Sequence, residues 1–134
     1  MTCVASAFLT YPPVAMSIHV KEQYHAVIIE LKGKFLGSID GDEFKSTIDR
    51  LKEEEQLQVV VDMQETTFID SSGIGTLIAA QTSMRKEGGD IRLANMGARV
   101  HGVFVITRLL GSAFTSYDSV EEALESFRTD PKPA

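Results

Sequence analysis

The sequence predicts an α/β fold with an open mixed, mostly parallel sheet, an N-terminal antiparallel hairpin and four helices. Strand-like and helix-like segments alternate along most of the chain, in the order β-β-α-β-α-β-α-β-α, which is typical of a mostly parallel sheet. The segment at 57–63 is apolar and rich in Val, as in a strand that is buried on both faces. The first two strand-like segments are separated by only a short turn, which favours an antiparallel hairpin.

Hydrophobic periodicity locates each element in turn. Apolar and polar residues alternate at 16–21, so this strand should have one face in water. The segment at 33–42 contains three glycines and is expected to be a loop, and Gly88-Gly89 should end the second helix. The expected strands are 16–21, 26–31, 57–63, 90–94 and 114–117. The expected helices are 43–55, 72–87, 99–110 and 119–128.

The chain is long enough for one domain with its own core, which we place at residues 16–128. Residues 1–15 lack the basic start of a signal peptide and include Pro12-Pro13, so we expect a disordered lead-in. Residues 129–134 include two prolines and are expected to form a flexible tail. The sequence does not decide whether the natural chain starts at Met1 or at Met16.

Composition excludes several classes of function. The net charge of −6 argues against direct binding of nucleic acid, which needs clustered Lys and Arg. No apolar run approaches the roughly 20 residues of a membrane span, so we expect no membrane insertion. Cys3 is the only cysteine, which rules out an intrachain disulfide and a cysteine zinc site. We expect a cytoplasmic protein that holds no metal and no cofactor.

One stretch, Phe-Ile-Asp-Ser-Ser-Gly-Ile-Gly at 68–75, joins the most buried strand to the second helix. Asp70, Ser71 and Ser72 are all good N-cap residues, because a side-chain oxygen can accept from the free N–H groups of the first turn. Gly73 and Gly75 lower helix propensity but allow another surface to approach the backbone. The stretch should therefore expose two serines at a helix N-terminus, although a simple capping role is the plain alternative.

Enzymatic interpretations fit poorly. A serine hydrolase would place its nucleophile in Gly-x-Ser-x-Gly, with an acid and then a histidine downstream. Here the serines precede the glycines, and His101 is the only histidine downstream. A phosphate-binding loop would need a lysine directly after the last glycine, and Gly75 is followed by Thr76. We therefore expect that the protein is not an enzyme.

The stretch at 68–75 resembles the signature of the STAS-domain family of anti-sigma factor antagonists, and the resemblance extends over about residues 17–127. It implies that Ser71 is phosphorylated by an anti-sigma factor serine kinase, and that Asp70 positions its hydroxyl. It also implies that the unphosphorylated protein binds this kinase and frees a sigma factor, and that a phosphatase acting on phospho-Ser71 restores binding. Ser72 would cap the helix, and the two glycines would let the partner pack closely.

The resemblance also suggests a partner-binding surface. Its expected members are Asp70, Ser71, Ser72, Gly73, Ile74, Gly75, Leu36 and Asp40. Relatives commonly read Gly-x-Leu-Asp after the second strand, with the acid near the partner. This chain reads Gly-Lys-Phe-Leu at 33–36, so Leu36 stands in place of the acid and Asp40 is the nearest carboxylate. The change suggests a divergent partner.

Two alternatives remain open at this point. The domain would serve equally as a STAS subunit of a lipid-transport ABC complex or of another STAS assembly, where the serine need not be modified. A small nucleotide-binding enzyme is a weaker alternative. The sequence identifies neither the sigma factor nor the oligomeric state.

Overall fold

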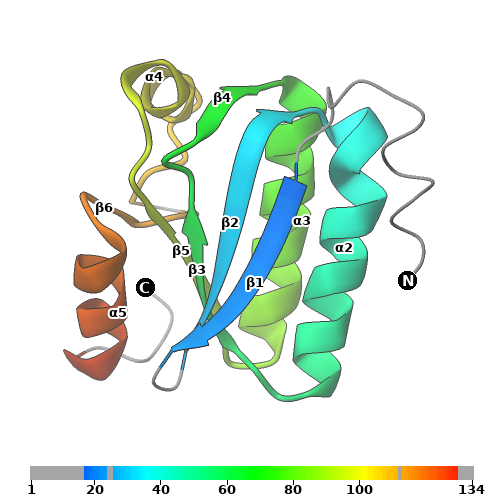
Figure 1. The fold of residues 1–134 in the computed structure, drawn as a ribbon, viewed down its shortest axis with the longest axis vertical. Coiled ribbons are helices and arrows are strands. Elements are labelled where there is room, and N and C mark those ends of the chain that lie inside the picture. Colours follow the sequence, from blue (N-terminus) through cyan, green and yellow to red (C-terminus); the bar gives the residue numbers. More distant parts are fainter. Residues whose placement is uncertain (1–16, 24–25, 112, 130–134) are drawn as a thin grey trace, which may run out of the picture.

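The computed structural model describes residues 17–23, 26–111 and 113–129. The expected lead-in at 1–15 lies outside the described residues, as does the expected tail except for Thr129, which ends the last helix. Figure 1 shows a central twisted sheet with helices on both of its faces.

The described residues contain six strands and four helices. In chain order these are β1 (Ser17–Gln23), β2 (Ala26–Phe35), α2 (Gly37–Glu53), β3 (Gln58–Asp62), β4 (Thr66–Ile69), α3 (Ser71–Lys86), β5 (Asp90–Ala94), α4 (Ala98–Ile106), β6 (Ser116–Tyr117) and α5 (Val120–Thr129). The predicted fold class and order are confirmed, and β4 is an additional short strand that the sequence analysis did not predict.

The sheet has the strand order β1-β2-β3-β5-β6, in which β1 and β2 are antiparallel and the other neighbours are parallel. The strand β4 lies off this path and pairs in parallel with the last residues of β2. A register shift at Gly33/Lys34, together with a φ of 100° at Gly33, redirects the end of β2 toward β4.

The prediction of a loop at 33–42 is therefore wrong. Residues 33–35 continue β2 because β4 supplies their hydrogen-bonding partner, and α2 begins at Gly37, directly after Leu36. This early start brings the first turn of α2 next to the start of α3, at the carboxyl ends of the parallel strands (Figure 1).

The core has two parts, one on each face of the sheet. Alternate residues of β2, Val27 and Ile29, face the larger cluster with α2 and α3, while Ala26 and Ile28 face α5. Hydrophobic periodicity in the sequence predicts nine core residues, of which seven are buried and two are half-buried. The buried ones are Val59, Val61, Ile74, Leu77, Phe104, Leu124 and Phe127, and the half-buried ones are Ile78 and Val103.

None of the helices within the described residues is both long enough and apolar enough to span a membrane.

Leu77 is fully buried in the middle of α3, so Leu77→Ala should lower the free energy of unfolding by roughly 2–5 kcal/mol. Urea unfolding measures this change. Val105→Ala is a suitable control, because Val105 is 53% exposed on α4 and its truncation should change stability by less than about 0.5 kcal/mol. An equally small loss for Leu77→Ala would contradict the packing of α3 described above.

Candidate functional site

The stretch at 70–75 forms the start of α3, directly after β4. Asp70 is the N-cap residue with extended backbone (φ −99°, ψ 178°), and Ser71 is the first helical residue. Ser71 and Ser72 are both exposed. The predicted presentation of two serines at a helix N-terminus is thus what the structure shows.

One carboxylate oxygen of Asp70 accepts the hydrogen bonds that hold the start of α3 in place. Asp70 Oδ1 accepts hydrogen bonds from the backbone N–H of Gly73 at 2.6 Å and from the Ser72 hydroxyl at 3.1 Å. The same oxygen accepts from the backbone N–H of Gly37 at 3.2 Å, which belongs to the first turn of α2. Asp70 therefore caps α3 and also holds the start of α2. Our expectation that Ser72 is the cap is wrong, because the Ser72 hydroxyl donates to the cap instead.

The pKa of the Asp70 carboxyl is lowered by this environment. Partial burial acts in the opposite direction and would raise the pKa. Hydrogen bonds from Gly73, Gly37 and Ser72 outweigh it, because they stabilise the ionised form. Asp70 is therefore a charged acceptor under ordinary conditions.

The two serine hydroxyls differ in their surroundings. The Ser72 hydroxyl is engaged by Asp70, whereas the Ser71 hydroxyl makes no hydrogen bond within the described part of the chain. The first turn of α3 contains no acidic residue, so a negative group on Ser71 would lie at the positive end of the helix dipole. Of the two hydroxyls, that of Ser71 is the more available for modification.

The two glycines also differ, which corrects their expected roles. Gly73 is buried, and a Cβ atom there would lie 2.7 Å from the carbonyl oxygen of Phe35. Its small size serves packing of α3 against β2 and not the approach of a partner. Ile74 is only 8% exposed and belongs to the core. Gly75 is exposed with open space around it, so it remains a candidate for close contact.

The start of α2 supplies the other expected partner-binding residues. Leu36 is the N-cap of α2, is half-buried, and makes no side-chain capping bond. Asp40 is only 3% exposed, and its Oδ2 accepts from the Leu36 backbone N–H at 3.0 Å. The Asp40 carboxylate thus fixes the turn, and direct contact of Asp40 with a partner stays a prediction.

Several exposed apolar residues escaped the sequence analysis. Ile39 is 65% exposed on the first turn of α2, and Phe68 is 40% exposed on β4, two residues before Asp70. Ile106, at the end of α4, is 81% exposed, and α4 packs beside β4. The exposure of Ile39 was not predicted because its segment was expected to be a loop. The exposure of Phe68 was not predicted because β4 was not expected.

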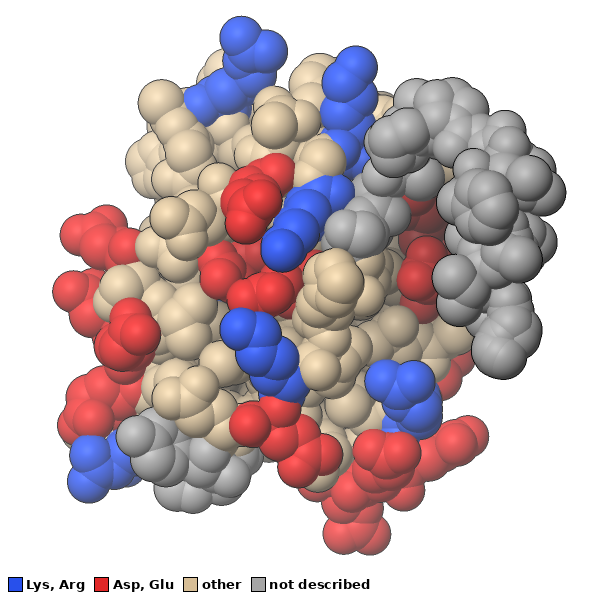
Figure 2. Space-filling view, viewed as in Figure 1, with Lys and Arg blue, Asp and Glu red and all other residues tan. Residues whose placement is uncertain are grey.

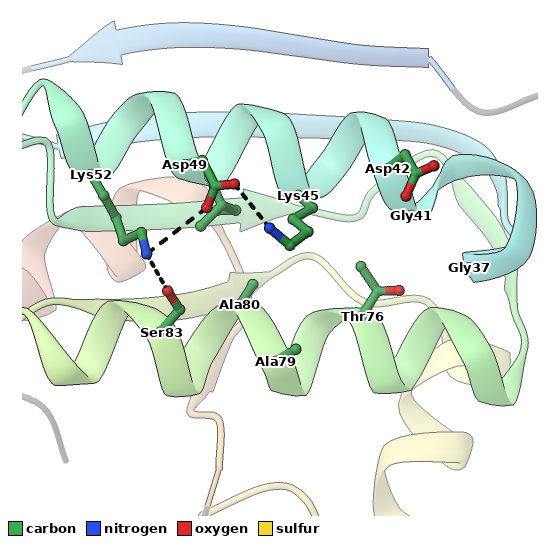
Figure 3. A pocket seen from close by; sticks show the side chains of 11 residues that line it. Gly37, Gly41, Asp42, Lys45, Asp49, Lys52, Thr76, Ala79, Ala80 and Ser83 are labelled. Atoms are coloured by element: carbon green, nitrogen blue, oxygen red, sulfur yellow. Dashed lines mark hydrogen bonds and ion pairs between the residues drawn. The ribbon is translucent and has the colours of Figure 1, made fainter.

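A groove of about 310 Å³ runs between α2 and α3. Figure 3 shows that Lys45, Asp49 and Lys52 line one side of the groove, while small residues of α3 line the other. Asp49 lies 3.0 Å from the Lys45 ammonium and 3.9 Å from that of Lys52, so it neutralises part of their charge. The groove therefore does not resemble a phosphate-binding site, which weakens the nucleotide-binding alternative.

No cluster of three or more His, Cys, Asp or Glu side chains that could hold a metal ion occurs among the residues that the structure describes.

Because Asp70 is the cap, Asp70→Ala should lower the free energy of unfolding by about 0.5–2 kcal/mol, the usual effect of losing an N-cap. Ser72→Ala removes only an exposed hydroxyl and should cost less than about 0.5 kcal/mol. Urea unfolding of the two variants compares these losses directly. A larger loss for Ser72→Ala would contradict the assignment of the cap.

The lowered pKa of Asp70 predicts a pH dependence of stability. A carboxyl with a folded pKa below its unfolded value of about 3.9 adds stability above that pH. This contribution is lost as the pH falls through the folded pKa. Asp70→Asn can still cap the helix but cannot titrate. The difference in free energy of unfolding between wild type and Asp70→Asn, measured at pH 7 and at pH 3, should therefore shrink at pH 3. A constant difference would contradict the capping bonds.

The geometry agrees with comparisons to known proteins. The model of the STAS domain family matches residues 17–123. An anti-sigma factor antagonist from Mycobacterium paratuberculosis is similar in structure, with a TM-score of 0.76 and 18% identity over 89% of this chain and 99% of the other. The phosphorylated form of the Bacillus cell fate determinant SpoIIAA has a TM-score of 0.65 and 19% identity over 84% of this chain and 100% of the other.

A sulfate transporter family protein from Wolinella succinogenes is also similar, with a TM-score of 0.67 and 23% identity over 81% of this chain and 89% of the other. At these sequence identities the solved structures establish the fold alone, and this fold occurs both in anti-sigma factor antagonists and in a transporter family protein. The family match itself covers most of the chain, including both strands of the hairpin and the whole start of α3. The chain therefore belongs to the STAS domain family.

Proposed function

We propose that this protein is an anti-sigma factor antagonist that binds an anti-sigma factor serine kinase and is switched off by phosphorylation of Ser71. In the unphosphorylated state it would occupy the kinase and so free a sigma factor for transcription. A phosphatase acting on phospho-Ser71 would restore binding. This role requires no catalysis by the chain itself and suits a protein of the cytoplasm.

The single observation that carries the proposal is the exposed hydroxyl of Ser71 at the start of α3, which makes no hydrogen bond to any residue that the structure describes. Its neighbour Ser72 is engaged by Asp70, so the two adjacent serines are not equivalent. The related protein SpoIIAA has solved structures in an unphosphorylated and in a phosphorylated form. The similarity of fold to that protein supports a phosphorylation switch here as well.

The surroundings of Ser71 support a protein partner. Phe68 lies on β4, directly before α3 in the chain, and Ile39 lies on the first turn of α2, which Asp70 ties to the start of α3; both are exposed. Exposed apolar residues near one end of a domain are typical of an interaction surface. In Figure 2, acidic side chains gather at the left, over α5, and at the bottom, where α2 ends. The upper end of this face shows fewer acidic side chains.

Phosphorylation of Ser71 would act on the interface and not on the fold. A phosphate adds about −1.5 to −2 charge at neutral pH, and the N-terminus of α3 tolerates this charge because of the helix dipole. At a contact surface the same dianion would have to lose its water. An unpaired charge buried in this way costs several kcal/mol even after relaxation. The binding free energy should therefore change much more than the free energy of folding.

A subunit of a transport assembly is the second candidate function. The similarity to a sulfate transporter family protein and the presence of Leu36 in place of the usual acid both favour it. In that role the domain would stay bound whether or not Ser71 is modified. Co-purification from the native cell distinguishes the two: a soluble kinase favours the switch, and a stable ATPase–permease complex favours transport.

Incubation with the cognate kinase and ATP, followed by mass spectrometry, should locate phosphate on Ser71. Phosphate found only outside Ser71 and Ser72 would reject the proposal.

Phospho-Ser71 protein and Ser71→Asp should keep their circular dichroism and melting temperature, yet bind the kinase at least about tenfold more weakly, which corresponds to about 1.4 kcal/mol. Ser71→Ala should bind like wild type and resist inactivation, because it cannot accept phosphate. Ser72→Ala should remain switchable, since its hydroxyl is not the acceptor. Titration calorimetry against the kinase gives the affinities of the wild type and of these four forms. Equal affinity of the wild-type and phospho-Ser71 forms would exclude the switch and favour the assembly subunit.

A further inference from the structure

Gly37 is where α2 touches the start of α3 most closely. A Cβ atom at this position would overlap the carbonyl carbon and oxygen of Ser72 and would lie 2.6 Å from the backbone nitrogen of Gly73. These are backbone atoms of a helix, which cannot swing aside as a flexible side chain can. Figure 3 shows Gly37 at the beginning of α2, on the side that faces α3. Position 37 therefore tolerates only glycine while the two helix starts keep this separation.

A hydrogen bond reinforces this close approach. The N–H of Gly37 donates to Asp70 Oδ1, the oxygen that also caps α3 and accepts from the Ser72 hydroxyl. Leu36, the N-cap residue of α2, supplies no side-chain cap of its own. The start of α2 is consequently held by a carboxylate that belongs to the neighbouring helix.

The turn that is held in this way carries an exposed apolar side chain. Ile39 follows Gly37 by two residues and is 65% exposed, while Asp40 fixes the turn from inside through the Leu36 N–H. The segment 36–39 thus presents the apolar side chains of Leu36 and Ile39, together with the exposed Ser38 and no carboxylate, beside Ser71. A partner that fits this segment needs an apolar contact surface rather than a cation.

We propose that Gly37 is a positioning residue for partner recognition: it sets the distance between the apolar turn at 36–39 and Ser71, so that one apolar surface of the kinase contacts both. The proposal rests on the proposed function, since it concerns the same kinase. Gly37 itself need not touch the kinase. Its lack of a side chain lets the turn with Leu36 and Ile39 lie against the backbone of Ser72.

The test compares three glycine-to-alanine variants in the full chain. Gly37→Ala should weaken kinase binding by at least about tenfold and slow phosphorylation of Ser71. Gly89→Ala is the matched control for steric overlap, because its Cβ would collide with Leu57 at the opposite end of α3, 2.8 Å from the Leu57 Cβ atom. Gly102→Ala is the control for substitution without overlap, because its Cβ meets open space on α4.

Gly89→Ala and Gly102→Ala should both bind the kinase within about twofold of wild type, although Gly89→Ala should lose stability. The KM of the kinase for Gly37→Ala should rise while kcat changes little, a split that general destabilisation would not produce. If Gly37→Ala does not fold, Ile39→Asp tests the same surface. Ile39 is exposed, so this substitution should leave folding unaffected. It should weaken binding by a similar factor.

The possible results distinguish a failure of the positioning role from a failure of the proposed function. Wild-type protein that does not bind the kinase would overturn both. Wild-type binding with unchanged affinity in Gly37→Ala or in Ile39→Asp would overturn the positioning role alone. Equal weakening in Gly37→Ala and Gly89→Ala would also overturn it, since the effect would then reflect lost stability.

Discussion

The hydrogen bonds to Asp70 Oδ1 are the interaction on which the candidate site depends. One oxygen accepts from Gly73 in its own helix, from the Ser72 hydroxyl and from Gly37 in the neighbouring helix. Each helix leaves N–H groups of its first turn unsatisfied, and here one charged acceptor serves two helices at once. The starts of α2 and α3 are thereby held together at the carboxyl ends of the parallel strands, which is the edge where open α/β sheets commonly bind their partners.

This arrangement explains why two adjacent serines have different surroundings. Ser72 is tied to the cap and takes part in the structure, whereas Ser71 faces solvent with its hydroxyl free within the described part of the chain. A phosphate on Ser71 would meet the favourable end of a helix dipole and leave the capping bonds intact. A modification there can change binding without unfolding the domain, because the core beneath it, including Ile74 and Leu77, is already packed.

The same arrangement accounts for the unusual segment after β2. Leu36 occupies the N-cap position of α2, but its side chain cannot accept a hydrogen bond from the first turn. Two carboxylates accept from the N–H groups at this helix start instead: Asp40 accepts from Leu36, and Asp70 of the neighbouring segment accepts from Gly37. The consequence is a turn that exposes the apolar side chain of Ile39 while the carboxylate of Asp40 is buried. Such a surface is compatible with an apolar partner, and it departs from the acidic surface that the family signature implies.

The sequence by itself determined the fold class, the hairpin, the core faces of the helices and the exposed serine pair, because these follow from hydrophobic period and capping chemistry, which are local. It did not determine that β2 runs on to Phe35, since that extension needs the distant strand β4 as a partner. Nor did it determine which of three possible caps is used, or that Gly73 and Asp40 are buried. Only the tertiary structure decided these points, because the start of α3 meets Phe35 of β2 and Gly37 of α2, which are more than 30 residues away in the chain.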